Sequence, residues 1–237
     1  MFRFGIPLVA LLSFAELNGP CQVNPRMANS EDSLRSMVMQ ATGEDRRFIN
    51  GSLYQEVYPH SIGHPFYGNG NWTEGSLVML GKTSDGLLLK YDITNDLLIY
   101  NHVHESGIYA VNLNKALIEE FALDGTRFRQ LSHPDQVAPA GFYQMVTTGT
   151  ASYYIRWVKQ YEPPSAASQG RFTRIKQSYI QVQGELFRVK GRGGLLRALE
   201  DQKKPIKQYL REHQITIRGD NETGLRQVVD YYNQLQP

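Results

Sequence analysis

The pattern of apolar and polar residues divides the chain into three stretches. An 11-residue apolar run, Phe4–Phe14, follows the single positive residue Arg3. A polar stretch without clear periodicity, residues 16–50, comes next. From Gly51 onward short segments alternate between apolar and polar positions, and the last 45 residues change to helical spacing. The pattern predicts a leader, a flexible segment and one folded region.

Alternation with a period of two residues predicts strands in the folded region. Leu87–Ile93 puts its apolar residues on one face, and the turn residues Thr94-Asn95-Asp96 lead into a second strand, Leu97–His104. Asp124-Gly125 is typical of a hairpin. Nine or ten such segments joined by short turns predict an antiparallel sheet. The other segments are 108–112, 120–123, 127–131, 142–148, 152–161, 178–183 and 186–190.

Helical spacing appears three times near the C-terminus. Gly193–Leu199 is a short helix, Asp201 begins a second with Pro205 in its first turn, and Asp220 or Asn221 caps a third. The third helix carries an apolar stripe of Leu225, Val228, Val229, Tyr232 and Leu235. The predicted fold is therefore α+β: a mainly antiparallel β sheet, curved or partly closed, with three C-terminal helices covering one face or end.

The first 15 residues are typical of a secretory signal peptide. Ser13 and Ala15 occupy the −3 and −1 positions that a signal peptidase prefers, and the apolar run is too short to span a bilayer. We expect a signal peptide at 1–15, a flexible segment at 16–50 and a single β-rich domain at 51–237. A sub-boundary near 132–140 is an alternative, because Ser132–Pro139 has the composition of a linker.

The only cysteine, Cys21, lies just after the predicted leader. One cysteine excludes an internal disulfide framework, so the fold depends on its core. A lipid-anchored protein also begins with a cysteine at such a position, although Pro20 before it disfavours lipid anchoring.

Charge is unevenly distributed along the chain. The net charge is +2, but Lys159–Arg211 holds 12 Lys and Arg against 4 Asp and Glu. Such asymmetry can mark contact with an anionic envelope surface or an acidic protein, but a solvated face that maintains solubility is the favoured interpretation. We expect no nucleic-acid partner. The candidate contacts at the last hairpin and first helix are Arg188, Lys190, Arg192 and Arg197.

The segment Tyr58–Trp72 concentrates aromatic residues with Gly, Pro and His. Exposed rings beside polar groups suit stacking on a sugar or peptide. Alternatively, these rings close the end of the sheet. The candidate ligand-binding residues are Tyr58, Phe66, Tyr67 and Trp72.

Metal binding and catalysis have weak support in the sequence. His102 and His104 project from the same face of one strand, and Glu105, His60 or His64 could add a ligand, but surface or loop histidines are the favoured interpretation. The chain has no G-x-S-x-G elbow, and its GRGG segment at 191–194 lacks the Lys-Ser/Thr of a P-loop. We therefore expect no cofactor, and we favour a non-enzymatic protein.

Three segments resemble a family of exported Bacteroidetes proteins of unknown function. They are LLLKYDITNDLLIY (87–100), the hairpin and helices of 178–215, and VVDYYNQL (228–235). The resemblance implies export to the periplasm or outer-membrane periphery of a Gram-negative bacterium, without a known reaction. The leading hypothesis is a non-enzymatic envelope interaction or accessory component. The alternative is a small extracytoplasmic hydrolase or carbohydrate-binding module that uses the loop 58–72.

Overall fold

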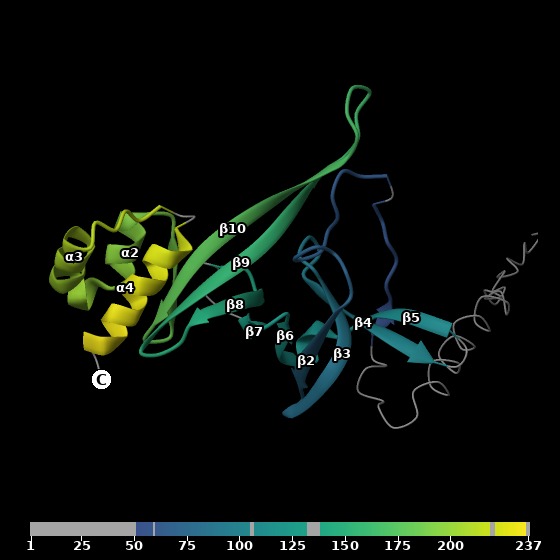
Figure 1. Cartoon of the computed structure of the whole chain (residues 1–237), viewed down its shortest axis with the longest axis horizontal. Coiled ribbons are helices and arrows are strands. Elements are labelled where there is room, and N and C mark those ends of the chain that lie inside the picture. Colours follow the sequence, from purple (N-terminus) through teal and green to yellow (C-terminus); the bar gives the residue numbers. More distant parts are fainter. Residues whose placement is uncertain (1–50, 59, 105–106, 132–137, 219–220, 236–237) are drawn as a thin grey trace, which may run out of the picture. The chain divides into compact units, whose positions relative to one another are not determined.

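An antiparallel sheet forms most of the described structure. The computed structural model describes residues 51–58, 60–104, 107–131, 138–218 and 221–235. Among them, eleven strands pair in the order β1-β5-β4-β3-β2-β6-β7-β8-β9-β10-β11, and the sheet is open between its end strands (Figure 1). The strands are β1 (Ser52–Leu53), β2 (Thr73–Met79), β3 (Lys82–Asp92), β4 (Leu97–His104), β5 (Gly107–Asn112), β6 (Ile118–Leu123), β7 (Thr126–Leu131), β8 (Gly141–Thr147), β9 (Ala151–Glu162), β10 (Arg171–Val182) and β11 (Glu185–Val189).

The α+β prediction is confirmed, including the three C-terminal helices. They are α2 (Arg192–Ala198), α3 (Lys203–Glu212) and α4 (Glu222–Leu235). Two short 3₁₀ helices, η2 (Lys115–Leu117) and η3 (Glu200–Gln202), are also present. Every pairing between named strands is antiparallel. The sequence suggested a curved or partly closed sheet. Among the described strands the two end strands, β1 and β11, do not pair, so the sheet is not closed.

Tight turns fix the register of the hairpins. Asp124 and Gly125 have positive φ angles of 48° and 70°. Positive φ at both central residues is typical of the two-residue hairpin turn that matches the twist of its strands. Gln183 and Gly184 (φ 51° and 83°) form the last hairpin turn, and Glu185 already pairs with Val182. The sequence placed that turn one residue later, at Gly184-Glu185.

Aromatic side chains fill the core beside β2, β3, β6, β7 and β8. Tyr91, Phe121, Phe128 and Phe142 are almost completely buried, and the ring centroids of Phe121 and Phe128 lie 4.8 Å apart in a stacked arrangement. The Tyr91 hydroxyl donates a hydrogen bond of 2.6 Å to Asp96 in the turn that follows β3. Large rings contributed by four different strands thus supply much of the hydrophobic burial in this part of the sheet.

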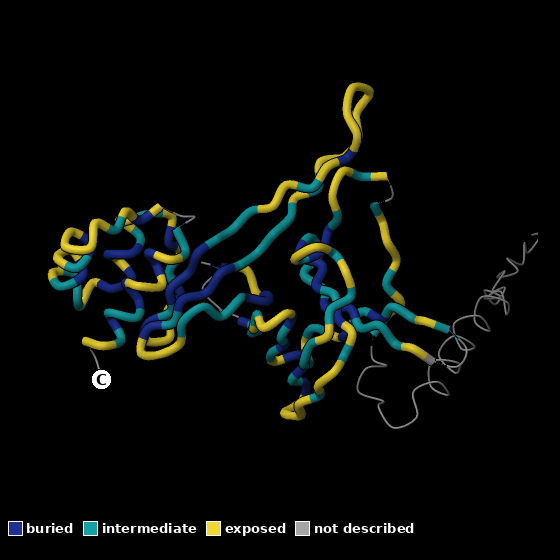
Figure 2. The backbone as a smooth tube through the Cα atoms, viewed as in Figure 1, coloured by how far each residue is buried: buried dark blue, intermediate teal, exposed yellow. Residues whose placement is uncertain are grey.

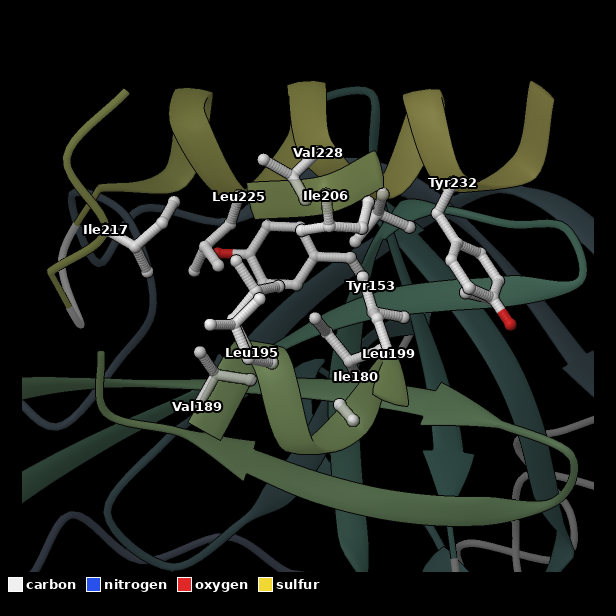
Figure 3. Close-up of a cluster of buried hydrophobic side chains, with 14 of the residues drawn as sticks. Tyr153, Ile180, Val189, Leu195, Leu199, Ile206, Ile217, Leu225, Val228 and Tyr232 are labelled. Carbon is white, nitrogen blue, oxygen red and sulfur yellow. The ribbon is translucent and has the colours of Figure 1, made fainter. Parts of the chain in front are cut away.

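A second core lies between the helices and the last strands of the sheet. Figure 2 shows dark, buried backbone where α2 and α4 meet β9, β10 and β11, and exposed backbone at the loop 163–169 that joins β9 to β10. Side chains from the sheet meet side chains from the helices there (Figure 3). Those labelled in Figure 3 are Tyr153, Ile180, Val189, Leu195, Leu199, Ile206, Ile217, Leu225, Val228 and Tyr232.

The closing helix α4 packs as its apolar spacing predicts. Leu225, Val228, Val229 and Tyr232 are fully buried, whereas Leu235 is 36% exposed. Asn221 is the N-cap, since its side-chain oxygen accepts a hydrogen bond of 2.9 Å from the Gly224 N–H.

Two strands begin well before their predicted start, and two strands were missed. β10 begins at Arg171 rather than Ser178, β3 begins at Lys82 rather than Leu87, and neither β1 nor β2 has a counterpart among the predicted strands. The mostly polar segment Arg171–Gln177 forms strand because each residue pairs with a residue of β9, in the register Arg171↔Glu162 to Gln177↔Arg156. Pairing with the preceding strand, and not an apolar pattern of its own, specifies this segment.

Several predictions concern residues outside the described ranges. The signal peptide at 1–15, the segment at 16–50, Cys21, Glu105 and most of the linker Ser132–Pro139 lie there. Around that linker, β7 pairs with β8, so the described sheet continues across it. None of the helices in the described ranges combines the length and the apolar content that crossing a bilayer requires.

Candidate anion-binding groove

A groove of about 470 Å³ lies beside β10 and β11. Its described lining combines one aromatic ring, four basic side chains and no Asp or Glu. The lining residues are Trp157, Arg174, Lys176, Gln177, Ser178, Arg188, Val189 and Lys190.

Unequal strand lengths create the groove. β11 pairs with β10 only from Ser178↔Val189 to Val182↔Glu185, and the chain then turns into α2. β10 continues past that point and pairs with β9 as far as Arg171. The space that a longer β11 would fill is therefore open beside Arg174–Gln177, and the groove lies there.

Trp157 forms an apolar wall of the groove. It pairs with Lys176 across β9 and β10, and its indole N–H donates a hydrogen bond of 2.6 Å to the Gln144 side chain. The guanidinium carbon of Arg174 lies 5.1 Å from the centroid of the indole ring, and the Lys176 Nζ lies 5.9 Å from it. These cation–π contacts hold two positive groups at the groove wall.

The basic side chains differ in how far solvent reaches them. Lys176 is only 17% exposed, and its Nζ lies 3.4 Å from Glu222 at the start of α4. Arg174, Arg188 and Lys190 are exposed. A ligand would meet exposed charges at the mouth of the groove and a partly neutralised lysine deeper inside.

A buried hydroxyl pair supports the inner end of the groove. Ser178 Oγ lies 3.1 Å from the Tyr153 hydroxyl, and both residues are buried. Burial raises the pKa of Tyr153 to about 12, so its hydroxyl stays protonated. The pair accordingly contributes hydrogen bonding and no charge.

The structure separates the four basic residues that the sequence grouped together. Arg188 and Lys190 line the groove, whereas Arg197 lines a second hollow of about 340 Å³ on the helices, with Lys203 and Lys207 among its neighbours. Arg192 is exposed at the start of α2.

Sequence reasoning missed Arg174 and Lys176 as groove residues, although it counted both in the local charge. Both share the even-numbered face of β10 with Ser178, Ile180 and Val182, but this grouping becomes visible only once the strand is known to begin at Arg171.

The four aromatic candidates of the loop 58–72 lie in different environments. Phe66 is 6% exposed, and the Tyr58 ring centroid lies 4.5 Å from that of Tyr161. Lys90 Nζ lies 4.7 Å from the Trp72 ring centroid. These three side chains pack against the chain itself.

Tyr67 connects the aromatic loop to the groove. Its ring centroid lies 5.1 Å from that of Phe128 and 5.9 Å from that of Trp157. Its backbone N–H donates a hydrogen bond of 2.8 Å to the Tyr91 carbonyl. Burial raises the pKa of the Tyr67 hydroxyl. Tyr67 thus supports Trp157 from the loop side.

Lys159 fastens the same loop to the sheet. Its Nζ donates hydrogen bonds of 2.7 Å to the His64 carbonyl and 2.8 Å to the Phe66 carbonyl, and it lies 3.3 Å from His64 Nδ1. Burial, followed by the charge of Arg174, lowers the pKa of Lys159 to about 8. Lys159 therefore acts as a structural clamp beneath the loop.

His64 accepts hydrogen bonds at Nδ1. The Phe66 N–H donates to this atom over 3.2 Å, which requires Nδ1 to be unprotonated. Burial first, then Lys159 and Lys90, lower the pKa of His64. The neutral ring is thus the form that fits the loop.

The histidine pair of β4 lies at one end of the β4–β5 ladder. His102 pairs with Tyr109 and His104 with Gly107, and the His102 ring centroid lies 5.7 Å from that of Tyr100. Within the described ranges, no group of three or more His, Cys, Asp and Glu could hold a metal ion. His60 is exposed in the loop before β2.

In comparisons with protein-family models, curated proteins and solved structures, nothing matches this chain. The groove and its chemistry therefore have to be interpreted from the structure itself.

Proposed function

We propose that this protein is an exported, non-enzymatic component of the cell envelope that binds an acidic partner protein through the basic groove. The observation that carries the proposal is the clustering of Arg174, Lys176, Arg188 and Lys190 around one hollow. Positive charge in a concave site concentrates anionic ligands and accelerates their association.

A protein partner suits the groove better than a membrane surface does. Lys176 is only 17% exposed, so a flat array of lipid headgroups would reach it less easily than an inserted carboxylate. The hollow also offers the indole of Trp157, which favours a ligand with an apolar part beside its charge.

Export is proposed on the signal-peptide pattern of residues 1–15, and a place at the envelope on the resemblance described above. The alternative, a hydrolase or carbohydrate-binding module that uses the loop 58–72, has less support. Phe66 is buried, and Tyr58 and Tyr67 pack against other rings, which leaves little aromatic surface for a sugar.

A binding measurement with poly-L-glutamate tests the proposed function. We expect the full chain to bind it in low salt and to lose affinity as salt rises, because exposed charges are screened over about 10 Å at 0.1 M salt. The double variant Arg174→Gln/Arg188→Gln should bind about tenfold more weakly, which corresponds to about 1.4 kcal/mol.

The matched control removes the same charge elsewhere. Lys204 and Arg211 are exposed on α3 and do not line the groove. The variant Lys204→Gln/Arg211→Gln should keep most of the affinity. Equal losses in both double variants would assign the binding to diffuse charge and refute a role for the groove.

A further inference from the structure

The outer edge of β10 is covered only in part by strands. β9 pairs with β10 along its whole length, from Arg171 to Val182. On the other side, β11 pairs with Ser178–Val182 only. In the described chain, Thr173–Ile175 therefore has a neighbouring strand on one side alone.

The same edge already holds one extended segment of the chain. The Ile62 N–H donates a hydrogen bond of 2.7 Å to the Gly170 carbonyl, and the Phe172 N–H donates one of 3.1 Å to the Ile62 carbonyl. Ile62 and Arg171 form a parallel bridge. The backbone at this edge of β10 can therefore form hydrogen bonds with an added extended segment.

Strand geometry places the backbone of Arg174 on this edge. Peptide groups point to alternate sides along a strand, so Arg174 shares its outward direction with Phe172 and Ser178. Phe172 donates to Ile62 on that side, and Ser178 pairs with Val189 on it. Arg174 is exposed and lines the groove, so an added strand would reach its N–H and C=O from the groove.

We propose that the groove binds an acidic segment of a partner protein in extended form, as a strand added to β10 beside Thr173–Ile175. This inference rests on the proposed function and specifies how the partner is held. Edge strands are templates for such addition, in which backbone hydrogen bonds supply affinity and alternate side chains supply specificity.

Charge complementarity identifies the segment. Arg174 and Lys176 lie two residues apart, so their side chains project from one face of β10, next to Trp157. An added strand with Glu or Asp at every second position would direct its carboxylates to that face. Arg188 pairs with Tyr179 and projects from the opposite face of the sheet; with Lys190 it lines the end of the groove nearest β11, where the end of the segment would lie.

A set of three peptides tests this inference on the full chain. The parent peptide alternates Glu and Val over five residues and has blocked ends. Two derivatives carry backbone N-methyl groups, one on the Glu residues and one on the Val residues. Strand addition uses only one edge of the peptide, so we expect one derivative to bind about tenfold more weakly and the other to bind like the parent.

A protein variant tests the same edge from the other side. Arg174→Pro removes both the charge and the outward N–H, whereas Arg174→Gln removes only the charge. We expect the proline variant to bind the parent peptide more weakly than the glutamine variant. In wild type, hydrogen exchange of the Arg174 amide should slow when the parent peptide binds. If Arg174→Pro fails to fold, the three peptides and the hydrogen-exchange measurement on the wild-type chain still test whether a strand is added to β10.

The outcomes separate the two proposals. If all three peptides bind equally and the Arg174 exchange rate is unchanged, strand addition is wrong while the acidic partner stands. If neither poly-L-glutamate nor the parent peptide binds, both proposals fall. Selective loss with one methylated derivative, together with amide protection, supports strand addition.

Discussion

Placing a carboxylate beneath α4 should destabilise the protein strongly. Val229 is fully buried in the core between α4 and the sheet. Val229→Ala removes two methyl groups, which at about 0.8 kcal/mol each, plus a small cavity, costs about 2 kcal/mol. Val229→Asp adds the cost of burying a charge. Small domains have only about 5–15 kcal/mol of total stability, so this variant should be marginal.

The cost of the charge can be separated by its dependence on pH. Burial raises a carboxyl pKa by about 3 units or more, and each unit corresponds to about 1.4 kcal/mol. At pH 7, ionisation of the introduced carboxyl in the unfolded state then lowers the free energy of unfolding by about 4 kcal/mol. At pH 4.5 the unfolded carboxyl is itself partly protonated, and this difference falls to about 1 kcal/mol. The stability gap between Val229→Asp and Val229→Ala should therefore shrink in acid.

Urea unfolding followed by circular dichroism measures both effects. Gln227→Asp is the control, because Gln227 is exposed on the same helix and tolerates a charge. Unfolding midpoints of Val229→Asp and wild type that coincide at pH 7 would show that α4 does not pack on the sheet. A gap between the Asp and Ala variants that stays constant from pH 7 to pH 4.5 would refute the burial of the carboxylate.

Three further results are expected. Mass spectrometry of the native protein should find a mature N-terminus near Glu16, and an unprocessed chain or a lipidated cysteine would contradict soluble export. The fold lowers the pKa of His64, so the stability that depends on its neutral ring is complete above about pH 6.5 and is lost as the pH falls through the folded pKa. His64→Asn keeps a hydrogen-bond acceptor, and in urea titrations it should reduce this loss of stability in acid. Tyr232→Phe removes the 2.9 Å hydrogen bond to Asp201 and should lower the unfolding free energy by about 1 kcal/mol, whereas an unchanged value would mean that solvent replaces the bond fully.

The fold class could be predicted because its determinants are local. Alternation in Leu87–Ile93, the Asp124-Gly125 turn and the apolar stripe of α4 each specify one element from neighbouring residues. The missed strand residues Arg171–Gln177 lack such a signal, since they become strand by pairing with β9. The apolar periodicity of a segment does not reveal strand residues that are specified by pairing with another strand.

The groove was beyond sequence reasoning for a related reason. Its existence depends on the difference in length between β10 and β11, and so on where two registers end. The charge of Arg188 and Lys190 was visible in the sequence, but the residues that complete the site, Arg174 and Lys176, were not yet assigned to a strand. The composition of the loop 58–72 left open whether its rings are exposed or close the end of the sheet, and only the packing of Phe66 reveals its burial.

The strand order has a consequence for how the chain folds. From β6 to β11 each strand pairs with the next one in sequence, so this half of the sheet can form one hairpin after another with small loop-closure entropy. The contacts of α4 are different, because Asn233 bonds to the backbone of Ala151 across 82 residues. We therefore expect the hairpins to form first and the docking of α4 to come late, as the step that commits the domain to its native state.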